Sequence, residues 1–341
     1  MRGRDRPGEV MDVSLLFPLS ASLLLAAGMG ASDTADAMGT AVGARILSYR
    51  RAVFLFALFL FVGAVLEGGK LVEPVGKGVV SGPLFLDHPL PFSLVLLLSG
   101  VAVVVSAWHG IPLSTHQLIL GGIIGGGVAG SLLAGPAEAG LQGGKVLQVV
   151  VAWCLTPFLS LLLSFLLCRL FRRLFLSVKD PAGLNLLFSL GVVSSGCYMA
   201  YVMGANGLGT VIGSFFATRG GELTPSFLRT MALGGAVLVV AGAFVLGERV
   251  VRTVGSGLAP LSPTSAIASQ LSAGLSVHLL TQYGLPVSMS HAIVTSVVGA
   301  GLAMDVSTVR TGRVRELVLV WILCPFLTFT LGVLFYALHL G

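Results

Sequence analysis

Charged side chains are scarce in this chain of 341 residues, since only 10% of its residues are Asp, Glu, Lys or Arg. A soluble domain carries roughly 25%, so the composition excludes an ordinary soluble globular protein. The hydrophobic fraction of 55% and the mean hydropathy of +0.97 indicate that most of the chain lies in lipid or against other membrane helices. The formal net charge of +6 adds little, because membrane proteins generally keep Lys and Arg in cytoplasmic loops.

The sequence also lacks the motifs of several kinds of chemistry. It has four cysteines and no Cys-x-x-Cys pair, which argues against metal, redox and disulfide frameworks. Neither Gly-x-Ser-x-Gly nor His-Glu-x-x-His occurs, so nothing supports an intramembrane enzyme. Basic residues do not gather with aromatic ones outside the apolar runs, which argues against nucleic acid as a partner. We therefore expect no enzymatic activity and no cofactor.

Apolar runs long enough to cross a bilayer recur along the chain. A spanning helix needs about 20 such residues, and the segments that qualify are 13–30, 52–69, 92–109, 146–168, 184–203, 228–247, 262–281 and 316–339. Shorter apolar pieces that contain glycine or proline lie between them, at 35–47, 112–131, 205–217 and 286–303. Such pieces are typical of half-helices and re-entrant hairpins, whose unpaired backbone is tolerated only inside protein or beside water. The sequence predicts an all-α polytopic membrane protein with discontinuous helices and re-entrant hairpins.

Two polar clusters interrupt the apolar sequence one half-chain apart. The cluster at 30–40 reads GASDTADAMGT and the cluster at 204–214 reads GANGLGTVIGS, so residues 30 and 204 are 174 apart. A second motif has the same offset, with Gly-Ile-Pro-Leu-Ser at 110–114 and Gly-Leu-Pro-Val-Ser at 284–288. A duplicated membrane chain with polar breaks at matching places is typical of a secondary transporter built from inverted-topology repeats.

The duplication also predicts how the chain is organised. We expect a first transmembrane repeat over residues 1–170 and a second over residues 184–341. Between them, residues 171–183 are basic and amphipathic, which indicates an inter-repeat loop lying on the lipid headgroups.

The polar clusters place oxygen-bearing side chains at helical spacing. In each half three of them lie four positions apart and share one helix face, namely Ser32, Asp36 and Thr40, and then Asn206, Thr210 and Ser214. Two such stripes meeting near the midplane would line a site for a tetrahedral oxyanion or a hard cation. Because a carboxylate inside a membrane is costly unless it is paired or bound to an ion, we expect Asp33, Asp36 and Asn206 to bind a cation.

The two Pro-x-Ser motifs predict helix starts. Pro112 and Pro286 suit a first helical turn, where the missing N–H of proline costs nothing. Free N–H groups and hydroxyls at such helix ends can hold an anion, which makes substrate-binding candidates of Ser114, Thr115, Ser288 and Ser290. Taken alone, each motif is better explained as an ordinary helix start with a capping hydroxyl. The duplication of the motif at the offset of the polar clusters favours anion binding instead.

Histidines follow both Pro-x-Ser motifs. His116 and His291 can act as proton sites, as donors to an anion, or as supports for the residues that bind substrate. A purely structural histidine with satisfied hydrogen bonds is an equal alternative at both positions. His278, inside an apolar run, is a weaker candidate.

Two acidic residues lie near the ends of related spans and close to basic ones. Glu67 precedes Lys70, and Glu248 precedes Arg249. We interpret both as interfacial ion pairs, with gating as the less favoured alternative.

The order and spacing of these motifs resemble those of the inorganic phosphate transporter (PiT) family over most of the chain. Each half of that family carries Gly-Ala-Asn-Asp-Val-Ala-Asn-Ala, which the clusters at 30–37 and 204–211 resemble. Its second motif, Gly-Leu-Pro-Val-Ser-Thr-Thr-His, resembles both Pro-x-Ser segments. The resemblance implies a homodimeric inverted-repeat symporter of the inner (plasma) membrane that moves phosphate with sodium or protons by alternating access. Its substrate site would lie between the repeats.

The resemblance also assigns positions residue by residue. Asp33 falls on the aspartate of the first-half motif and Asn206 on an asparagine of the second-half motif. The hydroxyl and histidine positions of the second motif fall on Ser114, Thr115, Ser288 and His291.

Departures from the family motif bear on the cation and on the substrate. Gly207 replaces the aspartate of the second half, which implies a lost cation ligand or a different stoichiometry. Hydrogen phosphate benefits from a carboxylate acceptor, whereas sulfate at neutral pH is served by donors alone. Asp33 and Asp36 keep phosphate ahead of sulfate, although relatives with eroded motifs include sulfate permeases. An anion channel is the alternative from another class, but the clustering of polar residues at one depth does not favour a continuous pore.

Overall fold

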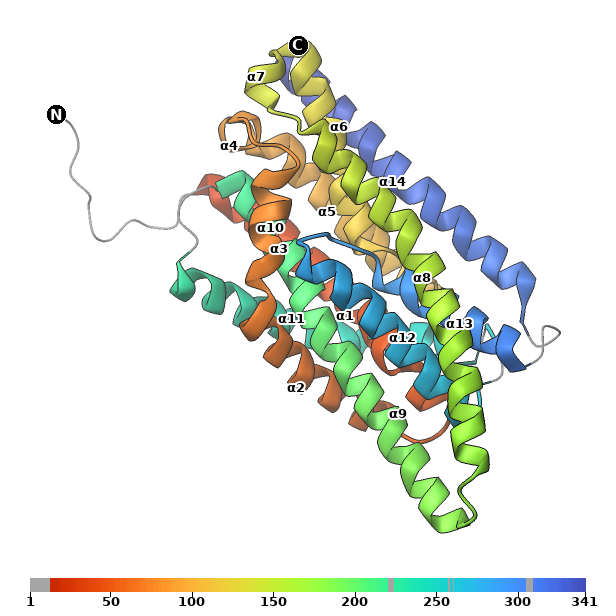
Figure 1. Cartoon of the computed structure of the whole chain (residues 1–341). Helices are drawn as coiled ribbons and strands as arrows, with labels where there is room; N and C mark the ends of the chain where they lie inside the picture. Colours follow the sequence, from red (N-terminus) through yellow and green to blue (C-terminus); the bar gives the residue numbers. More distant parts are fainter. Residues whose placement is uncertain (1–12, 220–223, 257, 260, 305–308) are drawn as a thin grey trace.

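The computed structural model describes residues 13–219, 224–256, 258–259, 261–304 and 309–341, and helices make up most of them (Figure 1). Among these residues, 8 helical segments are long and apolar enough to cross a membrane, so the chain is a multi-pass membrane protein. In chain order the helices are α1 (Val13–Gly43), α2 (Tyr49–Glu67), α3 (Gly69–Glu73), the π-helix η1 (Pro74–Gly78), α4 (Leu84–Asp87), α5 (Pro89–Trp108), α6 (Thr115–Leu133), α7 (Pro136–Ala139), α8 (Gly143–Leu176), α9 (Pro181–Met203), the π-helix η2 (Gly204–Leu208), α10 (Gly209–Arg219), α11 (Pro225–Ser256), α12 (Pro263–Gln282), α13 (Met289–Met304) and α14 (Thr311–Leu340).

The first polar cluster does not interrupt its helix. The pieces predicted at 13–30 and 35–47 form one helix, α1, so the prediction of a break there is wrong. No proline lies in the cluster, and Thr34 Oγ1 donates to the carbonyl oxygen of Gly30 at 2.8 Å within the same helix. A threonine inside a helix commonly bonds back in this way to the carbonyl four residues earlier, and the helix continues through the cluster.

The second polar cluster distorts its helix without ending it. The piece predicted at 205–217 continues from α9 through η2 into α10, and Pro181–Thr218 forms one spanning segment. The glycine-rich cluster forms the π-helical turn η2. Single π-helical turns inside α-helices are frequent at functional sites.

The basic segment between the halves is also helical where a loop was predicted. Residues 171–176 form the last turns of α8, and α9 already begins at Pro181. The leucines and arginines here are good helix formers, and Arg169 stacks on Phe165 with 4.3 Å between the guanidinium and the ring centroid. The connection is therefore short, and the carboxylate of Asp180 caps α9 by accepting from the N–H of Gly183 at 2.8 Å.

Helix α1 packs closely along α11, with glycines at the closest points. A side chain at Gly30 would overlap the carbonyl oxygen of Val239, and one at Gly242 would overlap the carbonyl oxygen of Ala27. Small residues allow such backbone contacts between membrane helices.

Helix α2 packs on the end of α9 and on η2 in the same way. A side chain at Gly204 would overlap the carbonyl oxygen of Leu60, and one at Gly63 would overlap that of Tyr201. These contacts correspond to those of α1 with α11, because residues 30 and 204 are 174 apart and residues 60 and 239 are 179 apart. Each contact thus has a counterpart in which the two halves are exchanged.

The same exchange occurs among α6, α8, α13 and α14. A side chain at Gly125 in α6 would overlap the carbonyl oxygen of Phe329 in α14, and one at Gly299 in α13 would overlap the carbonyl oxygen of Leu161 in α8. α6 of the first half therefore packs on α14 of the second, and α13 of the second half packs on α8 of the first.

Two turns reverse the chain, between α5 and α6 and between α12 and α13, and each leads from an exposed helix end into the protein. Each turn begins with a glycine in the left-handed region, Gly110 with φ of 72° and Gly284 with φ of 68°. Glycine adopts this conformation readily and commonly follows a helix end. Residues 112–114 and 286–288, which follow, are buried.

Candidate functional site

The middle of α1 supplies the first polar wall of the site. Ser32, Asp33, Asp36 and Thr40 are all buried, with no more than 4% of any of them exposed. Ser32 Oγ donates to the carbonyl oxygen of Leu113 at 3.4 Å, in the turn before α6. Asp36 Oδ2 accepts from the hydroxyl of Ser290 at 2.6 Å. α1 therefore joins the beginning of α6 to the beginning of α13.

The π-helical turn η2 supplies the second wall. Asn206 is fully buried and donates from Nδ2 to Thr281 Oγ1 at 2.8 Å, near the end of α12. The ring of His116 lies next to Asn206. Thr210 donates to the carbonyl oxygen of Asn206 at 2.9 Å, within its own helix. The amide of Asn206 thus links η2 to α12.

The two turns bring the beginnings of α6 and α13 to the same place. Ser114 Oγ accepts from the N–H of Gln117 at 3.4 Å, and Ser288 Oγ accepts from the N–H of His291 at 3.2 Å. Both hydroxyls therefore cap a helix, as the structural alternative for these motifs requires. The helices begin at Thr115 and Met289.

The prediction that proline occupies a first helical turn is wrong. Pro112 and Pro286 lie two residues before the capping serines, in the turns themselves. The serine hydroxyl is the better partner for free N–H groups at a helix start, so the helix begins after the serine.

Unpartnered polar atoms gather in these segments. Among the described residues, the buried side-chain atoms without a hydrogen-bond partner include Asp33 Oδ2, Asp36 Oδ1, Thr40 Oγ1, Thr115 Oγ1, His116 Nε2, Gln117 Oε1, Asn206 Oδ1 and His291 Nε2. A buried polar atom without a partner costs about 1–3 kcal/mol. Their concentration in α1, η2 and the beginnings of α6 and α13 marks a site suited to a polar ligand.

Gly207 faces Asp33 across the site. A Cβ added at Gly207 would lie 3.2 Å from Asp33 Oδ2 and 3.2 Å from Met29 Sδ. Residues 33 and 207 are 174 apart, so the corresponding positions of the two polar clusters meet. The carboxylate that the family motif has at the second of these positions would point at the first.

The beginnings of α6 and α13 also border an apolar cavity. It has a volume of about 640 Å³. Gln117 and His291 line it on one side, and Trp153, Trp321 and further apolar residues of α8 and α14 line the rest. The ring of His291 lies 4.1 Å from the Trp321 ring, centroid to centroid. His291 therefore lies between this cavity and the polar site.

Two of the predicted residues, Ser214 and Thr40, have no side-chain hydrogen bond to another segment. Ser214 donates to the carbonyl oxygen of Val211 at 2.8 Å, within α10, and links no other segment through that bond. Thr40 is one turn beyond Asp36 and is buried. Of the six residues in the two predicted stripes, Ser32, Asp36 and Asn206 form side-chain hydrogen bonds to another segment.

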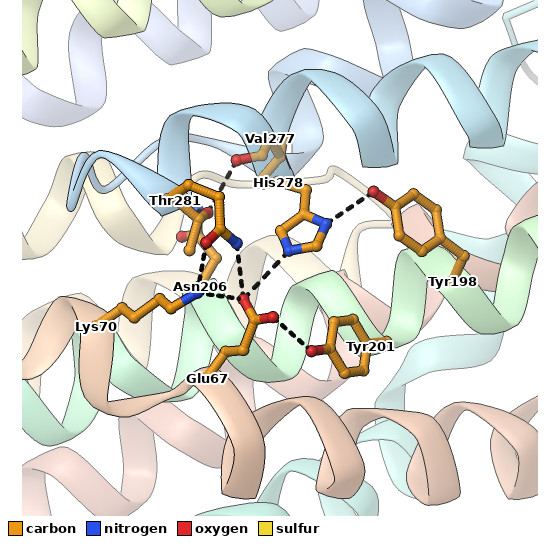
Figure 2. Close-up of polar contacts among 9 residues, drawn as sticks. Glu67, Lys70, Tyr198, Tyr201, Asn206, Val277, His278 and Thr281 are labelled. Atoms are coloured by element: carbon orange, nitrogen blue, oxygen red, sulfur yellow. Dashed lines mark hydrogen bonds and ion pairs between the residues drawn. The ribbon is translucent and has the colours of Figure 1, made fainter.

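A second polar cluster, which the sequence analysis underestimated, adjoins the site (Figure 2). Glu67 Oε2 accepts from Lys70 Nζ at 3.1 Å, from Gln282 Nε2 at 2.8 Å, and lies 3.2 Å from His278 Nε2. Glu67 Oε1 accepts from the hydroxyl of Tyr201 at 2.7 Å. The predicted Glu67–Lys70 pair is confirmed, but it belongs to a network that spans α2, α3, α9 and α12.

The other predicted ion pair is wrong. Glu248 pairs with Arg252 at 2.9 Å, one helical turn away. Arg249 instead donates to the carbonyl oxygen of Trp108 at 2.8 Å. Adjacent residues of a helix point in different directions, whereas residues four apart share a face.

The fold and this buried polar site define a multi-pass membrane protein of the transporter class. The model of the Phosphate transporter family matches residues 29–332, and the chain belongs to this family. The match confirms the resemblance inferred from the sequence motifs.

Individual relatives agree with this assignment. The chain is 26% identical over 324 residues to a Methanocaldococcus jannaschii protein that is provisionally named a phosphate permease. The alignment covers 94% of this chain and 97% of that protein. It is 28% identical over 325 residues to the sulfate permease CysP of Bacillus subtilis, covering 94% and 86%. The solved structure of a sodium-dependent phosphate transporter matches with a TM-score of 0.81 at 22% identity, over 96% of this chain and 98% of that one, which shows the fold.

Proposed function

We propose that this protein is a secondary active symporter that carries inorganic phosphate across a membrane by alternating access. The observation that carries the proposal is the convergence of α1, η2 and the beginnings of α6 and α13 on unpartnered, buried polar atoms. The names of relatives that are phosphate permeases support phosphate as the substrate. A buried site without an open route on both sides suits a carrier better than a channel.

Inverted-topology repeats over residues 1–170 and 184–341 fit the exchanged contacts. The contact of Gly30 with Val239 is repeated by that of Gly204 with Leu60, at the sequence offsets of the duplicated motifs. A pseudo-two-fold axis would produce such pairs. On this reading the α5–α6 and α12–α13 pairs are re-entrant hairpins whose turns meet at the substrate.

Each part of the site takes a distinct role toward phosphate. The N–H groups and hydroxyls at the starts of α6 and α13 would donate to the anion, with Ser114, Thr115, Ser288 and Ser290 as the hydroxyl candidates. His116 and His291 would donate through Nε2 or relay a proton. A carboxylate acceptor suits the proton of hydrogen phosphate, and Asp36 already accepts from Ser290 at one oxygen.

We propose sodium as the coupling ion and Asp33, Asp36 and Asn206 as its ligands. The unpartnered atoms Asp33 Oδ2, Asp36 Oδ1 and Asn206 Oδ1 are all oxygens, the ligand type that a hard cation prefers. The similar solved structure is named as sodium-dependent. A proton is the alternative, with Asp33 or Asp36 as its carrier.

Sulfate is the second candidate substrate, because Gly207 removes a carboxylate from the site. The sulfate permease of Bacillus subtilis is 28% identical to this chain. Sulfate has no proton at neutral pH and needs donors only. The plasma membrane and a homodimeric assembly remain expectations from the family.

The test is uptake of labelled phosphate and labelled sulfate into liposomes that contain the purified protein. Sodium and proton gradients are imposed separately, and counterflow distinguishes a carrier from an anion channel. We expect sodium-driven phosphate uptake with counterflow. Uptake of neither oxyanion under either gradient would contradict the proposal.

A further inference from the structure

Each of the two turns is held, at the exposed helix end where it begins, by a cation from the other half of the chain. Arg249 in α11 donates to the carbonyl oxygen of Trp108, at the end of α5, and its guanidinium lies 4.1 Å from the centroid of the indole. Lys70 in α3 donates to the side-chain oxygen of Gln282, at the end of α12. Residues 70 and 249 are 179 apart and residues 108 and 282 are 174 apart. The two contacts therefore lie at equivalent positions of the two halves.

The turn glycines follow the same correspondence. A Cβ added at Gly110 would lie 3.1 Å from Thr253 Oγ1, and one added at Gly284 would lie 3.2 Å from Pro74 Cγ. Residues 74 and 253 are again 179 apart. Each turn thus rests one helical turn beyond its cation, against η1 in one half and against α11 in the other.

We propose that Lys70 and Arg249 are gate-positioning residues. Lys70 holds the turn between α12 and α13 through Gln282, and we call this contact the Lys70 clasp. Arg249 holds the turn between α5 and α6 through Trp108, and we call this contact the Arg249 clasp. Release of one clasp opens the polar site to one side of the membrane, and release of the other opens it to the opposite side. This inference rests on the proposed function, because only inverted repeats present the two turns to opposite sides.

The two clasps are chemically unequal. Lys70 and Gln282 both donate to Glu67, which also bonds Tyr201 (Figure 2). In the second half, position 67 corresponds to Leu246, which cannot accept a hydrogen bond. The Lys70 clasp therefore has more bonds to break than the Arg249 clasp.

The Lys70 clasp is connected to the polar site through α12. Thr281 precedes Gln282 and accepts from Asn206 at 2.8 Å, while its own hydroxyl donates to the carbonyl oxygen of Val277 at 2.9 Å. Movement of this end of α12 pulls on the Asn206 amide. Opening of the gate and loosening of the site are thereby linked.

The experiment measures access to two reporter cysteines in a variant without the four native ones. The reporters Val277→Cys and Val103→Cys lie at corresponding positions, five residues before Gln282 and before Trp108, and both valines are no more than 1% exposed. The purified protein is treated with a hydrophilic maleimide in detergent, so both sides are accessible, and the alkylation rate of each reporter is compared between variants.

Lys70→Ala is expected to raise alkylation at position 277 about tenfold, the effect of losing a charge-assisted hydrogen bond on a two-state equilibrium, without a rise at 103. Arg249→Ala is expected to do the reverse. Lys70→Arg keeps the cation and is expected to restore the low rate. Arg313→Ala, which breaks an exposed ion pair with Glu316 on α14, is the matched control and is expected to change neither rate.

Glu67→Gln tests the same clasp should Lys70→Ala fail to fold, and it is expected to raise alkylation at 277 alone. Equal changes at both reporters, or none in folded variants, would overturn the gate assignment. The substrate proposal fails separately. If each variant raises alkylation at its own reporter but no oxyanion is taken up, the gate assignment is supported and the substrate proposal is contradicted. If ion-coupled uptake occurs but neither reporter responds in folded variants, only the gate assignment is contradicted.

Discussion

Asp33 and Asp36 lie one helical turn apart, yet their surroundings differ. One oxygen of Asp36 is used by Ser290, whereas Asp33 Oδ2 faces Gly207 without a partner. An unpaired carboxylate inside a membrane protein needs a counter-ion. On the proposed function we therefore expect Asp33 to be the stronger cation ligand, while Asp36 also holds the start of α13 against α1.

Asp33→Asn is expected to lower uptake at least about tenfold, because the amide lacks the charge that binds the coupling ion. Asp36→Asn is expected to lower uptake as strongly and also to weaken substrate affinity. Initial uptake rates against sodium and against substrate concentration separate the two effects. Size-exclusion profiles check folding, and unchanged kinetics in both variants would remove these residues from the mechanism.

Gly207→Asp is expected to shift uptake from sulfate toward phosphate, because it returns a carboxylate acceptor to a position beside Asp33. Two neighbouring carboxylates repel each other unless a cation lies between them, so the dependence on sodium should also steepen. Gly207→Asn has nearly the same volume without the charge and is the control. The readout is the ratio of the two uptake rates, and an equal ratio in both variants would contradict the idea.

At the scale of helices, Ser114 and Ser288 cap the starts of α6 and α13, and the proposed function also assigns their hydroxyls to binding the oxyanion. Ser114→Ala and Ser288→Ala are each expected to cost about 1 kcal/mol of stability through the lost cap. They are also expected to raise the KM for the oxyanion with little change in maximal rate. Thermal unfolding and uptake kinetics are measured on the same preparations. A lower Tm with an unchanged KM would reduce these serines to caps.

The exchanged glycine contacts give a packing prediction. Gly30→Leu and Gly204→Leu are expected to abolish a folded product, because each side chain would overlap a backbone carbonyl in the facing helix. Gly234→Ala, in α11 with no atom within 4 Å of the added Cβ, is the matched control. Membrane yield and monodispersity are compared, and normal behaviour of both leucine variants would refute the packing.

Across the whole molecule, sequence reasoning found the helical class and the family. It succeeded where the signal is local, as with the apolar runs and the duplicated motifs at 30 and 204. It failed where neighbours decide the backbone. The polar cluster of α1 is compatible with a continuous helix because Thr34 bonds back to Gly30, while other segments supply partners for Ser32 and Asp36.

The network around Glu67 escaped prediction for a related reason. Its members come from α2, α3, α9 and α12, and Glu67 and His278 are 211 residues apart in sequence. A sequence pattern identifies the charge at Glu67 and its nearby partner Lys70. It does not identify a histidine or a glutamine brought in by another helix.

The exchange of helices between the halves bears on how the protein is made. α1 leaves the ribosome long before α11, and its glycine face has no backbone to meet until most of the second half is in the bilayer. In a chain truncated after α8, the helices of the first half would therefore be inserted in the membrane but α1 would lack the helix on which it packs. Biogenesis then depends on a late docking step, and surveillance proteases have a long interval in which to act on the waiting first half.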